Sequence, residues 1–326
     1  MTGDVVKTVS AFASAGRFQA NQPAMISVKT WASADVEPRG VLQLNHGMVE
    51  YIDRYDDFAR AAATAGWLVV GMDYLGHGDS VDQVSQLGHT GLTLPGGGNV
   101  LLEDMDRLRR RTQERWPDRP YVMFGHSMGS FALRAYLAEH GDGLAGAVIC
   151  GTATMSAGLI GLAKALLAVL GLVQAPDHRS KVFAAMSLGG YNKPFERAGG
   201  ARTRFDWLSR DQRQVDQYVA DPRCGGVFTL AADRVLMDTI AQANAPGCCR
   251  RTPRDLPLLL LSGEADPVGS MGRAAPALAQ AYRDAGLGDV TVKLYPQARH
   301  ELLNETNRAD VSRDILDWLA GLTARR

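Results

Sequence analysis

Short apolar runs alternate with longer amphipathic stretches along most of this chain. Runs of about 4–8 apolar residues predict buried strands, whereas apolar positions spaced three and four apart predict helices. We expect strands at Ala24–Thr30, Val41–Asn45, Leu68–Asp73, Tyr121–Phe124, Leu144–Cys150, Leu256–Ser262 and Val290–Tyr295. We expect helices at Tyr55–Ala65, Leu101–Arg115, Phe131–His140, Arg273–Ala285 and Asp310–Leu322. This alternation predicts an α/β fold, with a mostly parallel central sheet flanked by helices.

The alternation stops between Thr152 and Arg254, where only helix-like segments and connections rich in glycine and proline occur. We therefore predict that residues 1–151 and 255–326 form two parts of one core, and that residues 152–254 form a helical cap inserted after the sixth strand. Within this cap, Leu159–Val173 is apolar on nearly every side. Such a helix is either buried all round, or it buries one side and offers the other to acyl chains or lipid. Both interpretations remain open.

Composition narrows the classes of protein to which the chain can belong. Its 326 residues are 46% apolar and 21% charged, which suits a large buried core. A net charge of zero lacks the basic excess of a nucleic-acid binder. The four cysteines form neither a disulfide framework nor a metal-binding pattern, and we expect no metal and no cofactor. No secretory signal is visible, so we expect a cytoplasmic protein. The sequence does not tell the oligomeric state.

The chemistry of the chain centres on Gly125-His126-Ser127-Met128-Gly129, which follows an apolar strand and precedes a helical segment. A Gly-x-Ser-x-Gly motif between a strand and a helix is typical of a nucleophile elbow. The serine there adopts a strained backbone conformation, and Cβ atoms at the two glycines would collide with the neighbouring strand and helix. The motif predicts that Ser127 is a nucleophile.

A serine hydroxyl needs a base to take its proton and an acid to orient that base. On this strand–turn–helix scaffold the acid and then the histidine follow the serine along the chain, each after a strand. Asp266 follows the apolar run that ends at Ser262, and Glu264 is the second choice; Asp266 could also serve only to form a turn. His300 is the only histidine that follows Asp266, so we predict it to be the base.

Acyl transfer also needs N–H donors for the oxyanion of the tetrahedral intermediate. One donor is expected from the residue after the nucleophile, Met128. The other is expected from the loop His46-Gly47-Met48-Val49-Glu50, where the N–H of Met48 is our candidate. The alternative is that both methionines only fill the core.

Four motifs carry a resemblance to a known family. They are His46-Gly47-Met48-Val49-Glu50, Asp73-Tyr74-Leu75-Gly76-His77-Gly78-Asp79-Ser80, Gly125-His126-Ser127-Met128-Gly129 and Arg299-His300-Glu301. In this order they resemble the monoglyceride lipase and lysophospholipase-like branch of the α/β hydrolases. The resemblance implies the α/β-hydrolase fold and a triad of Ser127, Asp266 and His300. Val49 and Tyr51 depart from the pattern, because relatives often carry smaller residues or histidine there.

The function we expect is hydrolysis of a carboxylic ester with one medium or long acyl chain, of the monoacylglycerol or lysophospholipid type, through an acyl-enzyme on Ser127. The partners would be a small ester or lipid substrate and, transiently, a membrane surface touched by the cap. One alternative is a peptidase or amidase that uses the same triad; another is a non-catalytic binder of small molecules. An epoxide hydrolase or dehalogenase would need a carboxylate in place of Ser127.

Overall fold

A computed structural model describes residues 4–18, 22–90 and 98–324, and its centre is a single eight-stranded sheet. The strand order is β1-β2-β4-β3-β5-β6-β7-β8; β1, β2 and β4 pair antiparallel, and the remaining pairs are parallel. The strands are β1 (Val5–Ala13), β2 (Met25–Ser33), β3 (Gly40–Asn45), β4 (Trp67–Met72), β5 (Tyr121–His126), β6 (Gly146–Cys150), β7 (Leu258–Gly263) and β8 (Val290–Tyr295). The predicted α/β fold is confirmed.

Strand β1 was not expected from the sequence. It lies at the edge of the sheet, pairs with β2 along all nine of its residues, and buries only Phe12. An edge strand of this kind lacks the continuous apolar run of a strand that is covered on both faces, which is why its pattern is weak.

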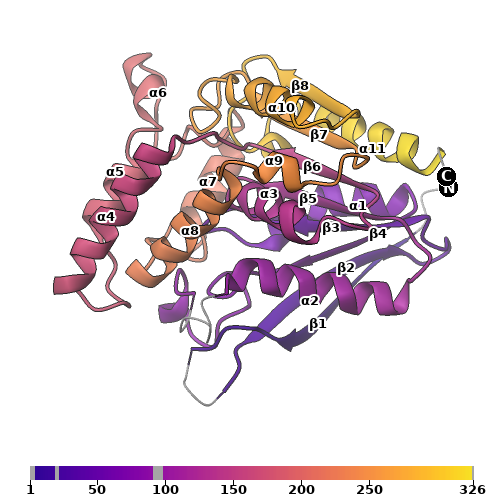
Figure 1. Cartoon of the computed structure of the whole chain (residues 1–326), viewed down its shortest axis with the longest axis horizontal. Coiled ribbons are helices and arrows are strands. Elements are labelled where there is room, and N and C mark those ends of the chain that lie inside the picture. Colours follow the sequence, from indigo (N-terminus) through magenta and orange to yellow (C-terminus); the bar gives the residue numbers. More distant parts are fainter. Residues whose placement is uncertain (1–3, 19–21, 91–97, 325–326) are drawn as a thin grey trace.

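Helices cover both faces of the sheet and give the molecule three layers (Figure 1). Apolar side chains of α2 (Val100–Arg115), α3 (Met128–His140) and α10 (Ala274–Asp284) pack in one core. Those of α1 (Asp56–Thr64) and α11 (Arg308–Ala324) pack in the other. Short 3-10 helices η1 (Ile52–Tyr55), η2 (Val84–Gln86) and η3 (Leu302–Asn304) lie in the connections.

The connection between β6 and β7 contains only helices among its described residues. They are α4 (Ala157–Val173), α5 (Lys181–Leu188), α6 (Lys193–Arg197), α7 (Gln212–Ala220), α8 (Leu230–Ala243) and α9 (Cys248–Arg251). In Figure 1, α4, α5 and α6 stand apart from the sheet, while α8 packs against both α3 and α4. We call residues 152–254 the cap; its boundaries as a separate domain stay a prediction.

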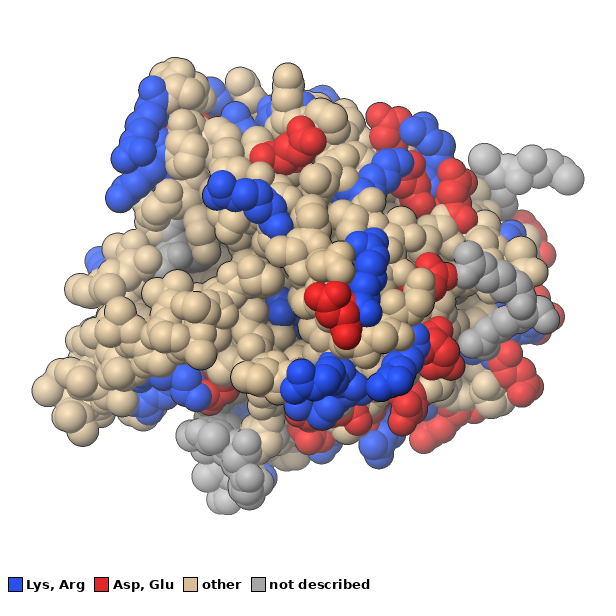
Figure 2. All heavy atoms as spheres, turned by 45° about the horizontal axis from the view of Figure 1, so that its top comes forward, with Lys and Arg blue, Asp and Glu red and all other residues tan. Residues whose placement is uncertain are grey.

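Helix α4 is not a buried cap helix. Among its side chains only those of Ile160 and Leu167 are buried, whereas Leu172 and Val173 are 84% and 80% exposed. Figure 2 shows few charged residues on the projecting end of the molecule that α4 and α5 form. The helix therefore buries one side and exposes an apolar side. In the described part of the chain, no helix has the length and apolarity that crossing a bilayer requires.

Candidate active site

Ser127 lies at a sharp turn between β5 and α3, with φ 51° and ψ −117°. This backbone conformation is rare for a residue with a side chain. A Cβ at Gly125 would lie 2.4 Å from the carbonyl oxygen of Gly129, and one at Gly129 would lie 2.3 Å from that of Asn45. The Ser127 N–H donates to the Cys150 carbonyl at 3.0 Å. The turn therefore has the geometry expected of a nucleophile elbow.

Asp266 follows β7 and His300 follows β8, and the structure brings their side chains together. Nδ1 of His300 lies 3.1 and 3.0 Å from the two carboxylate oxygens of Asp266, and both residues are buried. Glu264, the second choice from the sequence, is exposed. The Val268 N–H donates to Oδ1 of Asp266 at 2.9 Å and orients the carboxylate.

The environment of His300 sets its charge. Burial alone would lower its pKa, but the charge and hydrogen bond of Asp266 outweigh this, so the pKa lies above its ordinary value. Nε2 of His300 is buried and has no hydrogen-bond partner among the described residues. The ring of His126 packs beside it at 4.7 Å between centroids. Burial, with the charge of His300, holds the pKa of His126 well below its ordinary value, so His126 is neutral.

Backbone hydrogen bonds join the cap to the loop that carries His300. We call residues 206–209 the strap. The N–H of Glu301 donates to the carbonyl of Leu208 at 2.8 Å, and that of His300 donates to the carbonyl of Trp207 at 3.4 Å. The ring of Trp207 also packs on the imidazole of His300, with 5.1 Å between centroids. The hydroxyl of Ser209 donates to the Asn304 carbonyl at 2.8 Å. The strap is thus part of the support for this histidine.

The predicted oxyanion loop lies next to the elbow. Its first residue, His46, is held by its own ring: Nε2 accepts the N–H of Tyr74 at 3.0 Å, and Nδ1 lies 2.7 Å from the Gly47 carbonyl. Met48 and Met128 line the same cavity as Ser127. Within the described ranges, neither methionine N–H donates to a protein acceptor, so both remain available to a substrate oxygen.

A buried ionic network beneath these loops was missed by the sequence reasoning. Glu50 accepts the Gly47 N–H at 2.5 Å and the Tyr55 hydroxyl at 2.8 Å. Arg54 contacts Glu50 at 2.7 Å and holds Glu301 with two bonds of 2.6 Å. One guanidinium therefore joins the oxyanion loop to the residue after His300. Both glutamates lie inside the motifs named above, and the charge of Glu50 within the otherwise apolar run from Met48 to Ile52 was the available signal.

A cavity of about 330 Å³ extends from Ser127 into the cap. The core contributes Gly47, Met48, Val49, Glu50, His126, Ser127, Met128, Phe131, Val268, His300 and Glu301. The cap contributes mainly apolar side chains, namely Met155, Leu159, Leu162, Ala163, Leu166, Phe183, Met186, Tyr191, Phe205, Trp207, Leu208, Tyr218, Leu236, Met237 and Ile240, with Gly225. The polar groups gather at the Ser127 end, and most of the wall is apolar.

Comparisons with known proteins find relatives in both sequence and structure. Residues 36–307 match the family described as serine aminopeptidase, S33. The chain is 28% identical to a monoacylglycerol lipase of Mycolicibacterium smegmatis, over 87% of this chain and 89% of that protein. It is 27% identical to monoglyceride lipase of Mus musculus, over 87% and 83%. A thermostable carboxyl esterase from Bacillus coagulans, solved with glycerol, superposes with a TM-score of 0.86 at 27% identity, covering 97% of this chain and 99% of that chain.

The family match spans most of the chain, and the structure has the expected mostly parallel sheet. The chain belongs to the serine aminopeptidase, S33, family, in the monoglyceride lipase-like branch of the α/β hydrolases, and it is a carboxylic ester hydrolase.

Proposed function

We propose that this enzyme hydrolyses esters with a single acyl chain, of the monoacylglycerol or lysophospholipid type, through an acyl-enzyme on Ser127. One observation carries the proposal: Ser127 and the Asp266-paired His300 line the same apolar cavity. The names of the relatives from Mycolicibacterium smegmatis and Mus musculus support the monoacylglycerol type.

In the proposed mechanism, Ser127 attacks the ester carbonyl while Nε2 of His300 takes the hydroxyl proton. Asp266 stabilises the imidazolium that forms and keeps Nδ1 protonated. The N–H groups of Met48 and Met128 donate to the oxyanion. His300 then returns the proton to the leaving alcohol. In the second half, His300 activates a water that cleaves the acyl-enzyme and regenerates the Ser127 hydroxyl.

The shape of the cap supports a lipid substrate. Leu159, Leu162 and Met186 line the cavity and are also 52%, 67% and 67% exposed. The apolar wall of the cavity therefore continues onto the outer surface of α4 and α5. We propose that this surface rests transiently on a lipid layer and that an acyl chain enters along it. Burying each methylene is worth about 0.8 kcal/mol, so the cavity would discriminate among chain lengths.

The test is a panel of glyceryl and 4-nitrophenyl esters from acetate to palmitate, with lysophosphatidylcholine, assayed with the parent enzyme and with Ser127→Ala. We expect the highest kcat/KM for a medium or long chain. We also expect the loss of at least about a thousandfold in kcat for Ser127→Ala, with an unchanged melting temperature. Retained turnover by Ser127→Ala would exclude the mechanism.

Two further outcomes would favour the alternatives. Faster hydrolysis of an amide than of the matched ester would indicate a peptidase or amidase. Labelling of Ser127 by a fluorophosphonate without turnover of any ester in the panel would indicate a binding protein.

A further inference from the structure

The oxyanion loop is held by the cap as well as by the core. Val49 has φ 47°, an unfavourable conformation for a β-branched residue that persists only where surrounding contacts enforce it. Its carbonyl accepts the N–H of Gly225 at 3.0 Å and the hydroxyl of Tyr218 at 3.3 Å. Both donors belong to the cap. On the other side of Met48, Gly47 is fixed by Glu50, so the Met48 N–H lies between two anchored residues.

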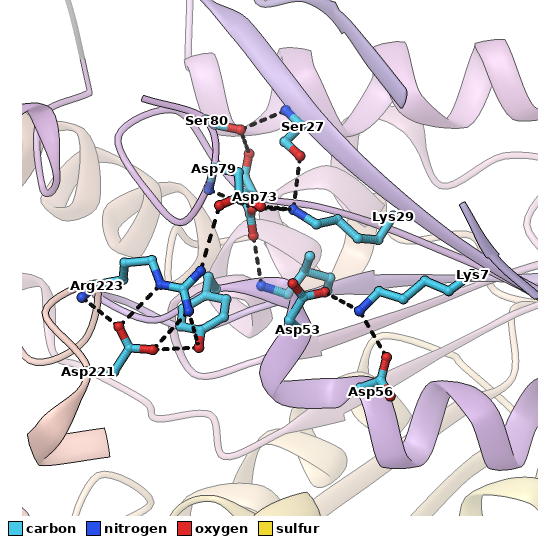
Figure 3. A network of polar contacts seen from close by, with 12 residues as sticks. Lys7, Ser27, Lys29, Asp53, Asp56, Asp73, Asp79, Ser80, Asp221 and Arg223 are labelled. Carbon is cyan, nitrogen blue, oxygen red and sulfur yellow. Dashed lines mark hydrogen bonds and ion pairs between the residues drawn. The ribbon is translucent and has the colours of Figure 1, made fainter. Parts of the chain in front are cut away.

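A cluster of three side chains secures this part of the cap; we call Tyr51, Asp221 and Arg223 the clamp. The hydroxyl of Tyr51 donates to Oδ2 of Asp221 at 2.6 Å and accepts from Arg223 at 2.7 Å. Arg223 also binds Asp221 at 3.0 Å, and its guanidinium lies 3.9 Å from the centre of the Tyr51 ring. Figure 3 shows the side chains of Asp221 and Arg223 lying against each other, with Asp79 on the other side of Arg223. Burial opposes the charge of Asp221, but its bonds from Arg223 and Tyr51 lower its pKa to about 2.

The clamp is connected to a network of hydrogen bonds and ion pairs around the buried Asp73. Asp73 is fully buried; its Oδ1 accepts the N–H of Ile52, the residue after Tyr51, at 2.8 Å. Its Oδ2 accepts the N–H of Asp79 at 2.9 Å, and Lys29 pairs with it at 3.0 Å. Arg223 reaches the Asp79 carboxylate at 3.6 Å. The clamp is therefore tied to the buried Asp73 twice, through the N–H of Ile52 and through Asp79, and Figure 3 shows Asp73, Asp79 and Arg223 in this order.

We propose that Tyr51, Asp221 and Arg223 are positioning residues that hold the Met48 N–H in place for the oxyanion. The inference rests on the proposed role of Met48 in ester hydrolysis. Tyr51 and Val49, the two departures from the family pattern, would then both help to hold the loop that carries Met48. A hydrogen bond to the oxyanion acts mainly in the transition state, so a loosened clamp lowers kcat more than it changes KM.

The experiment uses Arg223→Met and Asp221→Asn in the full chain, with 4-nitrophenyl butyrate as a soluble substrate. Outright removal of an oxyanion donor costs about 10²–10³ in kcat, and a displaced donor loses part of this, so we expect a drop of about tenfold with KM changed less than about twofold. The Ki of a butyl trifluoromethyl ketone, which forms an oxyanion on the serine, should rise by the same factor. Arg223→Lys should recover part of the loss, because it keeps the charge opposite Asp221.

The matched control is Arg202→Met, which breaks the cap ion pair with Asp216 at 3.0 Å, away from the oxyanion loop. It should keep the parent kcat and Ki. Thermal unfolding of every variant separates loss of function from loss of fold. An unchanged kcat in a folded Arg223→Met variant would overturn the inference, and so would a change in its KM alone. An equal drop in the kcat of Arg202→Met would also overturn it. Turnover retained by Ser127→Ala would instead overturn the proposed function itself.

Discussion

Nδ1 of His300 lies 3.0 Å from Oδ2 of Asp266, and this carboxylate outweighs burial to raise the pKa of His300. Because His300, as the proposed base, must be neutral to accept a proton, kcat/KM should rise with pH through this raised pKa, above the ordinary value of about 6.5. In Asp266→Asn burial acts without the carboxylate, so the rising limb should move to lower pH. We also expect kcat to fall by about 10³–10⁴. Initial rates on a soluble ester from pH 5 to 9 check both effects.

Glu264→Gln is the control for that profile, because Glu264 is exposed in the same loop. It should leave kcat unchanged, and the rising part of the pH profile of kcat/KM should stay at the same pH. A limb that stays in place in Asp266→Asn would show that the carboxylate does not set the pKa of His300.

Gly129→Ala should destabilise the fold and abolish activity. The new Cβ would lie 2.3 Å from the Asn45 carbonyl and 2.6 Å from that of His46, and neither backbone atom can move without displacing β3 or the oxyanion loop. We expect a loss of about 1–3 kcal/mol in the free energy of unfolding, measured in urea. Gly158→Ala is the control, because a Cβ there meets nothing within 4 Å. Equal stability of the two variants would contradict the proposed crowding.

Lys29→Met should cost about 3–5 kcal/mol of stability, because it leaves the fully buried Asp73 without its cation. Lys7→Met offers a comparison within the same region (Figure 3). Lys7 and its partners Asp53 and Asp56 are 25–30% exposed, so that change should cost less than about 1 kcal/mol. Urea unfolding of both variants measures the difference. An equal loss in the free energy of unfolding for both variants would mean that burial of the Lys29–Asp73 pair contributes little to stability.

The double variant Leu172→Asp, Val173→Asp tests the proposed lipid contact of α4. Both side chains are at least 80% exposed, and neither lines the cavity. Removing two large apolar groups and adding charge should weaken binding to phosphatidylcholine vesicles at least about tenfold. Turnover of 4-nitrophenyl butyrate should stay at the parent level. Co-sedimentation with vesicles measures the binding.

The control for the lipid contact is Val9→Asp, which removes an exposed apolar side chain from the distant edge strand β1. It should bind vesicles like the parent enzyme. Equal vesicle binding by the α4 double variant would exclude this helix as the contact surface.

The sequence predicted the buried strands well because they are covered on both faces. Every residue of β3, β4, β5 and β7 is buried, and a strand in that position appears as an unbroken apolar run. The edge strand β1 has no such run and was missed. Within the expected helix Leu101–Arg115, the burial of Arg109 was not expected: its guanidinium donates to the carbonyls of His140 and Asp142.

The candidate site was predictable where the signal is local or ordered along the chain. The elbow at Ser127 is a five-residue motif, and Asp266 and His300 follow strands in a known order. The surrounding network was not predictable in this way. Arg54 and Glu301 are 247 residues apart, and Tyr51 and Asp221 are 170 apart. Neither hydrophobic periodicity nor spacing indicates a pairing over such a distance.

Because of the strap, some segments of the cap can be replaced by those of a relative more safely than others. Residues 206–209 bond to the loop of His300, so grafting a whole cap from a relative would also replace part of the scaffold of this proposed base. A graft confined to α4 and α5 would replace part of the apolar wall of the cavity and leave that scaffold intact. Redesign of chain-length preference should therefore begin in residues 157–188.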